Sequence, residues 1–333
     1  MMKKVLKAAG SAWGQRISLL IVICIFMAIA QPIFFRASNA NSILLAIAVN
    51  GIMACGMLFT VLVGGLDLSV ASTAGMSAAI VFTFANSRGF ETNAFILGCA
   101  VALLFCLIVG WINGFFVTFF GLPAFVVTLA MKYVLYGSIN VLTNGIYIRI
   151  PDRKGIAYAI GNSNVFGIPM PVIIFIIVAI VSVFILSKTI FGRQLYAIGG
   201  NKNAANLAGV NSTWNTRLTF MISSVAAGLG GVMLASMGGQ AGQPTGAGQE
   251  GNVLMAMVVG GINLAGGEGG VSGAIVGALL VGIINNAMLL LSIGSDYQGF
   301  VQGVVILAAM TLNMYTKRGS EGAVRANLKR PNA

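Results

Sequence analysis

The sequence contains no histidine and only seven acidic residues among its 333 positions. Charged residues of both signs make up 8% of the chain, whereas soluble domains have about 25%. Without histidine, the scattered carboxylates do not predict a metal site. The four cysteines lie in apolar stretches without CxxC spacing, so we interpret them as small buried side chains rather than a disulfide framework.

The motifs of nucleotide-binding and hydrolytic enzymes are also missing. The sequence has no GxxxxGK[ST] loop to hold ATP phosphates, no GxSxG and no HExxH. We therefore expect neither enzyme activity nor a cofactor, and any motor that uses ATP must be another chain. The net charge of +12 is dispersed among apolar stretches, so it does not predict nucleic-acid binding.

Long apolar runs dominate instead: 58% of residues are hydrophobic and the mean hydropathy is +0.94. A membrane span needs about 20 apolar residues. The eighth predicted span begins in a polar run and is rich in glycine, so we expect it to be short or broken. We predict an all-α, polytopic transmembrane helix bundle with about ten spans, at residues 18–35, 42–64, 69–86, 94–120, 122–143, 170–187, 217–239, 248–264, 271–292 and 297–315.

The basic residues predict the orientation of these spans. With the amino terminus inside, 13 Lys and Arg fall on the inner side and 5 on the outer side, in agreement with the positive-inside rule. This predicts cytoplasmic segments at 1–17 and 317–333 around a membrane domain at 18–316. A cleavage-like Ala28-Ile29-Ala30 lies within the first apolar stretch, but that stretch continues to Phe35, which favours a retained span.

Two connections are long enough to suggest function. Residues 144–169 are predicted to form an outside loop, and residues 188–216 an inside loop that contains a short helix. Val63-Gly64-Gly65-Leu66-Asp67-Leu68 is also similar to Val259-Gly260-Gly261-Ile262-Asn263-Leu264. Both segments follow predicted outside-to-inside spans, so we interpret them as copies of an internal repeat, a common feature of transporters.

Ionisable groups are almost absent from the middle of the predicted spans. Lys132 is the exception, and no acid is evident at its depth; it either meets a water-filled pathway, which we favour, or binds carbonyls at a helix end. Carriers driven by protons or sodium generally need carboxylates along their path. The lack of mid-span acids therefore disfavours an ion-coupled carrier, although backbone carbonyls can bind sodium.

Asparagine is the recurrent polar residue of the spans. An amide offers donors and an acceptor without charge, which suits the passage of a neutral polyhydroxylated solute; bonding between helices is the alternative for each Asn. We expect Lys132, Asn50, Asn252 and Asn263 to line or gate a substrate pathway.

Several segments resemble one transporter family. Phe191-Gly192-Arg193-Gln194-Leu195-Tyr196-Ala197-Ile198-Gly199-Gly200-Asn201 is similar to the cytoplasmic segment of permeases in bacterial ABC importers for ribose, xylose, galactose and autoinducer-2. Gly64–Val70, Pro123–Leu129 and Val258–Gly267 match in family order, so the resemblance covers nearly the whole chain.

The resemblance implies a homodimeric permease in the bacterial inner membrane. A cytoplasmic ABC ATPase would bind the inside loop, a periplasmic binding protein would deliver a sugar or similar small solute, and lipid would surround the spans. The coupling residues implied are Gly192, Arg193, Gly199, Gly200, Asn201, Ala205 and Gly209.

The sequence departs from the family pattern near the eighth span. Asn252 stands where relatives commonly have Asp, and Gly251 is expected to interrupt the start of the helix. The cation is Lys132, whereas many relatives have Arg at the position of Tyr136, one turn later on the same face. An ABC permease for branched-chain amino acids, an ion-coupled carrier and a membrane protein without transport activity remain alternatives.

Overall fold

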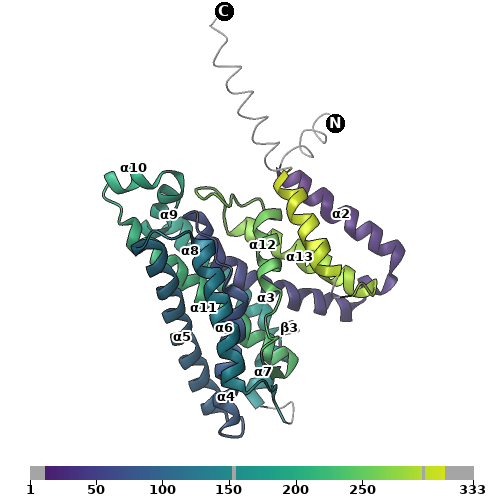
Figure 1. Cartoon of the computed structure of the whole chain (residues 1–333). Coiled ribbons are helices and arrows are strands. Elements are labelled where there is room, and N and C mark those ends of the chain that lie inside the picture. The colour runs from purple at the N-terminus through teal and green to yellow at the C-terminus, as the bar shows by residue number, and fades with distance from the viewer. Residues whose placement is uncertain (1–11, 152–154, 295–296, 312–333) are drawn as a thin grey trace, which may run out of the picture.

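The computed structural model describes residues 12–151, 155–294 and 297–311, which are mostly helical (Figure 1). The predicted tail 317–333 and most of the segment 1–17 lie outside the described residues. Helices occupy all ten ranges that the hydropathy predicts. They are α2 (Ala12–Ala30), α3 (Ala37–Leu62), α4 (Val70–Asn86), α5 (Thr92–Phe119), α6 (Ala124–Thr143), α8 (Met170–Lys188), α11 (Ser212–Gly238), α12 (Gln249–Val259), α13 (Val271–Leu290) and Tyr297–Thr311.

Six of the described helices, α3, α5, α6, α8, α11 and α13, are long and apolar enough to cross a membrane. The others are shorter: α4 has 17 residues, and Leu20–Ala30 and Tyr297–Thr311 are apolar helices below the usual spanning length. The eighth predicted span is represented by α12, which has only 11 residues. The expectation that it is short is confirmed.

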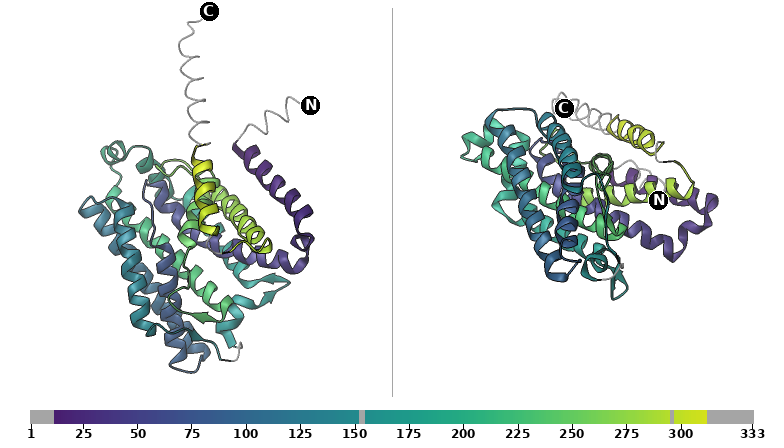
Figure 2. Two further views of the ribbon diagram at one scale, coloured as in Figure 1. Left: turned by 45° about the vertical axis from the view of Figure 1, so that its right-hand side comes forward. Right: turned by 60° about the horizontal axis from the view of Figure 1, so that its bottom comes forward.

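The centre of the molecule is formed by α3 and α11. Side chains from Ile47 to Leu62 are buried on every face of α3, and α11 packs against α3, α4 and α5. Small residues make this contact close, because a Cβ atom at Gly231 of α11 would collide with the backbone of Ala74 on α4. Figure 2 shows α2, α13 and the helix Tyr297–Thr311 grouped on one side of this centre.

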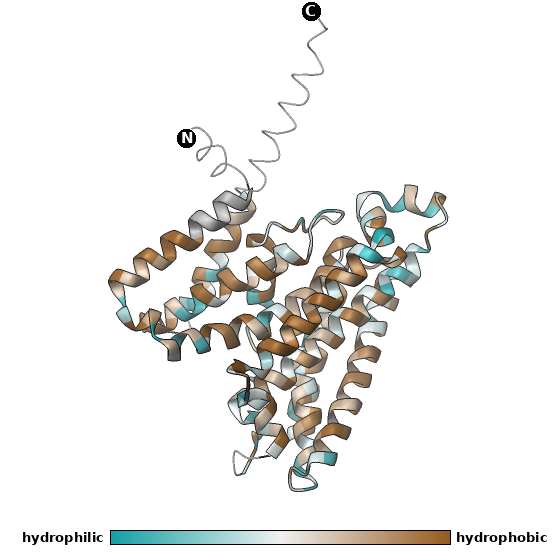
Figure 3. Cartoon of the chain, turned by 180° about the vertical axis from the view of Figure 1, so that it is seen from behind, coloured by the Kyte–Doolittle hydropathy of each residue, from teal (hydrophilic) through white to brown (hydrophobic). Residues whose placement is uncertain are grey.

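The outer helices α5, α6 and α8 expose large apolar side chains, among them Leu104, Tyr133 and Phe184. In Figure 3 the apolar colour runs along the lengths of the helices, whereas hydrophilic residues gather near their ends. Such exposure is incompatible with a water-soluble surface but suits helices that face lipid.

The two long connections are folded. Residues 188–216 form α9 (Ile190–Gly200), α10 (Lys202–Leu207) and the start of α11, so the predicted short helix is confirmed as two. Thr189, Asn201 and Asn211 cap these helices by accepting hydrogen bonds from the backbone N–H groups of Gly192, Ala204 and Trp214.

The other connection, 144–169, contains α7 (Gly155–Asn162) and three short strands. Strand β1 (Ile148–Arg149) pairs antiparallel with β4 (Gln240–Ala241), and β2 (Asn164–Val165) pairs antiparallel with β3 (Ile168–Pro169). In the register, Ile148 lies opposite Ala241 and Asn164 opposite Pro169. Figure 1 places α10 at the opposite end of the bundle from α7 and the α4–α5 connection. A 3-10 turn, η1 (Pro32–Phe35), joins α2 to α3.

Helices α3 and α12 end in the same way. Gly64 and Gly261 adopt left-handed conformations, with φ of 77° and 68°. The N–H of Gly65 donates to the carbonyl of Thr60, and that of Ile262 donates to the carbonyl of Met257. Each pattern is a Schellman cap, which needs glycine because a side chain would be strained at that φ.

Candidate functional site

The site is built around the first turn of α12, a helix that packs against α3, α4 and α13. The preceding residues 240–248 are irregular but hydrogen-bonded: Gly242 N–H donates to Thr245 Oγ1, and Gln249 N–H donates to the carbonyl of Gly246. This segment packs against α4 so closely that a Cβ atom at Gly246 would lie 2.6 Å from the carbonyl oxygen of Ala71. The chain therefore enters the bundle before the helix starts.

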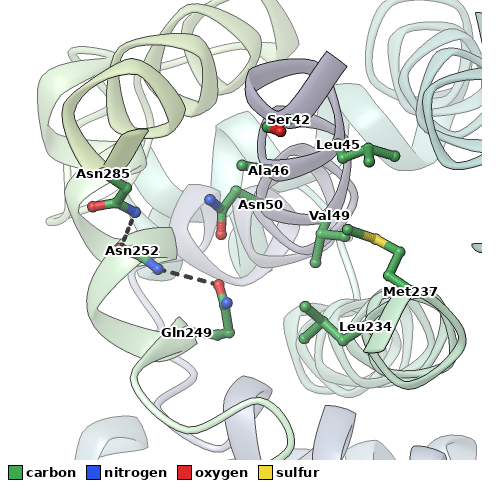
Figure 4. A pocket seen from close by; sticks show the side chains of 10 residues that line it. All are labelled: Ser42, Leu45, Ala46, Val49, Asn50, Leu234, Met237, Gln249, Asn252 and Asn285. Carbon is green, nitrogen blue, oxygen red and sulfur yellow. Dashed lines mark hydrogen bonds between the residues drawn. The ribbon is translucent and has the colours of Figure 1, made fainter. Parts of the chain in front are cut away.

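Four amide side chains meet at this point. Asn252 Oδ1 accepts a hydrogen bond from Asn285 Nδ2 at 2.9 Å, and Asn252 Nδ2 donates to Gln249 Oε1 at 3.3 Å (Figure 4). Asn252 Oδ1 also accepts from Gln302 Nε2 at 2.9 Å. These residues come from α12, α13 and the helix Tyr297–Thr311. Asn252 is the centre of the amide cluster, which we define as Gln249, Asn252, Asn285 and Gln302.

A cavity of about 330 Å³ opens beside three members of the amide cluster (Figure 4). Asn50 reaches it from α3; its side chain is 4% exposed, and its Oδ1 is buried without a hydrogen-bond partner. Asn285 Oδ1 is buried and unpartnered as well. Because an unmade hydrogen bond in the interior is costly, a movement that opened these acceptors to the cavity would favour a ligand that donates hydrogen bonds. The lining residues are Ser42, Leu45, Ala46, Val49, Asn50, Leu234, Met237, Gln249, Asn252 and Asn285.

Gly251 lies inside α12 and does not interrupt it, so that expectation from the sequence is wrong. A Cβ atom at this position would lie 2.8 Å from Oε1 of Gln302. The absence of a side chain therefore leaves room for Gln302 to approach α12 and reach Asn252. The glycine serves contact between helices here rather than breaking one.

Lys132 has an acidic partner, contrary to the expectation that no acid lies at its depth. It forms an ion pair with Glu250, whose Oε1 is 2.5 Å from Lys132 Nζ. The sequence places Glu250 at an outer end, but residues 240–248, which pack against α4 through the buried Gly246, bring it to the middle of α6. The lack of a mid-span acid therefore no longer argues against an ion-coupled carrier. Lys132 Nζ also lies 5.9 Å from the ring centroid of Tyr136, as their one-turn spacing predicts.

Asn263 is separate from this group. It lies between α12 and α13, where its Nδ2 donates to Gly266 O at 3.3 Å and Glu268 Oε2 at 3.4 Å, while its Oδ1 accepts from Ala265 N. Of the four predicted pathway residues, Asn50 and Asn252 line the cavity, and Lys132 pairs with the acid next to Gln249. Nothing in the sequence indicates that Gln249 joins the amide cluster or that Glu250 lies at the depth of Lys132. Asn285 and Gln302, in contrast, stand out in the sequence as amides within apolar spans.

The predicted coupling residues lie on α9 and α10 and around them. A Cβ atom at Gly192 would collide with the end of α8, and one at Gly199 with Leu62 O and Gly267 N. Ala205 is buried, while Arg193 and Asn201 are exposed. Gly200 and Gly209 have open space around them, and Gly209 has a left-handed φ of 84°.

The contact at Gly199 joins both Schellman junctions to α9. Gly267 N–H donates to the carbonyl of Leu62 at 2.9 Å, so the loops after α3 and after α12 are bonded to each other beside Gly199. Three backbones meet where only glycine fits. This close approach is a physical connection between the α9 surface and the helix that carries Asn252.

A buried polar network, which the sequence does not reveal, fixes the α3–α4 connection. Asp67 accepts hydrogen bonds from the Ser69 hydroxyl at 2.6 Å and the Ser223 hydroxyl at 2.7 Å, and Asn113 donates to Ser69 Oγ. Burial raises the pKa of Asp67 above its ordinary value, and the bonds from Ser69 and Ser223 act in the opposite direction. The connection is thereby tied to α5 and α11.

The amide cluster generates a prediction about stability. Asn252→Leu leaves the amide donors of both Asn285 and Gln302 without their acceptor, whereas Asn285→Leu still leaves Asn252 bonded to Gln302. We expect Asn252→Leu to cost about 1–3 kcal/mol of unfolding free energy, and Asn285→Leu to cost less. Thermal unfolding of the detergent-solubilised protein measures both; equal losses would contradict the central place of Asn252.

Comparison with known proteins assigns the family. Residues 39–310 match the family described as "Branched-chain amino acid transport system / permease component". The ribose import permease protein RbsC of Haemophilus influenzae is 36% identical over 298 residues, which cover 89% of this chain and 91% of that protein.

Two arabinose proteins are similar as well. The L-arabinose transport system permease protein AraH of Escherichia coli is 35% identical over 315 residues, 93% of each chain. The L-arabinose ABC transporter permease protein AraH of Azospirillum brasilense is 31% identical over 316 residues, 93% of this chain and 91% of its own. No solved structure matches. The chain therefore belongs to the family of ABC-transporter permeases that includes the ribose and L-arabinose permeases.

Proposed function

We propose that this chain is the membrane-spanning permease of an ATP-driven importer for a sugar or a similar polyhydroxylated solute. The observation that carries the proposal is the uncharged amide lining beside the start of α12, where Asn50 and Asn285 offer unpartnered acceptors to hydroxyl groups. Amides bind hydroxyls without the strong retention that a full charge would cause. The ribose and arabinose relatives support the same solute class, and the branched-chain amino acid alternative is not favoured.

In this proposal the solute passes Asn50, Asn252 and Lys132 on its way inward. Short helices that start at mid-membrane are typical of transporter binding sites, because their first turn presents free N–H groups and side chains to the pathway. Asn263, on the loop after α12, serves as a gate near the inner end rather than as part of the cavity.

The proposed topology has ten spans, with both termini cytoplasmic. The four shorter helices, α2, α4, α12 and Tyr297–Thr311, are counted as spans beside the six long ones. The common Schellman ends of α3 and α12 support an internal repeat that relates α3–α4 to α12–α13. We place residues 188–216 inside, residues 144–169 outside, and the tail 317–333 and segment 1–17 in the cytoplasm.

The proposed assembly contains two copies of this chain, a cytoplasmic ABC ATPase and a periplasmic binding protein in the bacterial inner membrane. The ATPase binds the exposed face of α9 and α10, and ATP is hydrolysed there and not on this chain. Coupling residues are Gly192, Arg193, Gly199, Gly200, Asn201, Ala205 and Gly209. Movement of α9 reaches the pathway through the backbone contact of Gly199 with Leu62 and Gly267.

Transport in proteoliposomes tests the function. With the ATPase and binding protein present, we expect uptake of a labelled pentose that requires ATP and survives an uncoupler. Asn50→Leu should lower the initial rate about tenfold, since a lost hydrogen bond to the moving solute is worth about 1–1.5 kcal/mol. Ser87→Ala, on the exposed α4–α5 connection, is the control. Uptake that persists without ATP, or that leucine abolishes by competition, would contradict the proposal.

Charge reversal tests the coupling surface. Arg193 and Arg149 are both exposed but lie on the connections at opposite ends of the bundle. We expect Arg193→Glu to weaken ATPase binding at least fivefold, because the introduced carboxylate would repel the ATPase surface that attracts Arg193 in the proposed complex. Arg149→Glu should leave the affinity for the ATPase unchanged. Pull-down titration of detergent-solubilised permease with the ATPase gives the two affinities. If Arg193→Glu bound as tightly as the parent, α9 would not be the docking surface.

A further inference from the structure

We infer that the Lys132–Glu250 ion pair is a charge-selectivity element, which keeps the middle of the pathway electrically neutral so that ions are not drawn into it. The inference rests on the proposed function, because it requires water to reach the pair. It assigns a role to Glu250, which is not among the predicted pathway residues and whose position in the sequence does not suggest this role.

The position of the two residues is unusual for charged groups. Lys132 is the ninth of the 20 residues of α6, and Glu250 is the second residue of α12. In the described parts of helices α3, α4, α5, α6, α8, α11, α12 and α13, the other Lys, Arg, Asp and Glu are Lys188 at the end of α8 and Arg217 near the start of α11. Two opposite charges thus stand together at a depth that is otherwise free of them.

The pair is close to the cavity and partly open. Each side chain is about one-fifth exposed. Glu250 follows Gln249 directly and precedes Asn252 by two residues, and both of these amides line the cavity. Either charge therefore acts on the cavity from within a Debye length, through a medium that screens it less than bulk water does.

Electrostatics then explains why both charges are present. A lone ammonium would concentrate anions in the pathway and repel cations, and a lone carboxylate would do the reverse. Paired at contact distance, the two fields largely cancel at the cavity. Glu250 also stabilises α12 by its position in the first helical turn. That role alone would not make the entry of ions into the pathway depend on the sign of their charge.

Thiol reagents of opposite charge measure this directly. In membrane vesicles with the ATPase bound, Cys24, Cys55, Cys99 and Cys106 are replaced by Ala. A reporter cysteine is then introduced beside the pair by Tyr136→Cys, or in the cavity by Asn285→Cys. The readout is the ratio of modification rates by an anionic and a cationic methanethiosulfonate of similar size.

We expect this ratio at both reporters to rise about threefold in Glu250→Gln and to fall about threefold in Lys132→Gln, as one uncompensated charge at about 10 Å predicts in a partly aqueous pathway. The double variant Lys132→Gln/Glu250→Gln, which is neutral and cannot form the ion pair, should return to the parental ratio. Loss of a purely structural contact would not shift the ratio in opposite directions.

The outcomes separate this inference from the proposed function. If Asn285→Cys reacts and the ratio stays constant in both single variants, or moves in one direction only, the selectivity role is overturned and the pathway stands. If Asn285→Cys reacts but Tyr136→Cys does not, the pair faces lipid and the role is again overturned. If neither reporter reacts, the cavity is not aqueous, and both the pathway and the selectivity role fail.

Discussion

The structure depends on one constraint: inside a membrane, backbone that is not helical must find its hydrogen bonds within the protein. Residues 240–248 form several such hydrogen bonds, through turns at Gly242, Thr245 and Gly246 and through the pairing of β4 with β1. Close packing on α4 buries Gly246, and Ala241 and Gly242 are buried as well. Because this segment packs against α4 and is partly buried, the first turn of α12 brings the amide cluster and Glu250 to the level of Lys132.

The same kind of constraint links the proposed pathway to the α9 surface. At Gly199, Leu62 and Gly267 the backbones touch, so no side chain is present to absorb a displacement of α9. Close-packed interfaces shift between discrete arrangements rather than deform gradually. In the proposed cycle, an ATPase that moves α9 therefore moves the ends of α3 and α12 together. The Asp67 network keeps the α3–α4 connection intact during this movement, since it ties that connection to α5 and α11.

The sequence predicts the helices well because their apolar runs are long, and it predicts the short α12 because a polar, glycine-rich run precedes it. The ion pair could not be predicted, because it depends on how residues 240–248 pack against α4 and not on local propensity. Asn263 follows the end of α12, as its place in the predicted repeat suggests. The prediction that Gly251 interrupts α12 is wrong for a related reason. The sequence cannot distinguish a glycine that breaks a helix from one that allows close contact between helices, and only the approach of Gln302 shows that Gly251 is of the second kind.

The proposed mechanism requires that solute pass the first turn of α12. Its most direct test is photolabelling of the assembled importer with a diazirine-bearing pentose during ATP-driven turnover, followed by mass spectrometry of the peptides. We expect adducts on residues 249–252 and around Asn50 and Asn285, which excess unlabelled pentose suppresses. Adducts confined to the exposed faces of α5 and α8, or unaffected by unlabelled pentose, would contradict it.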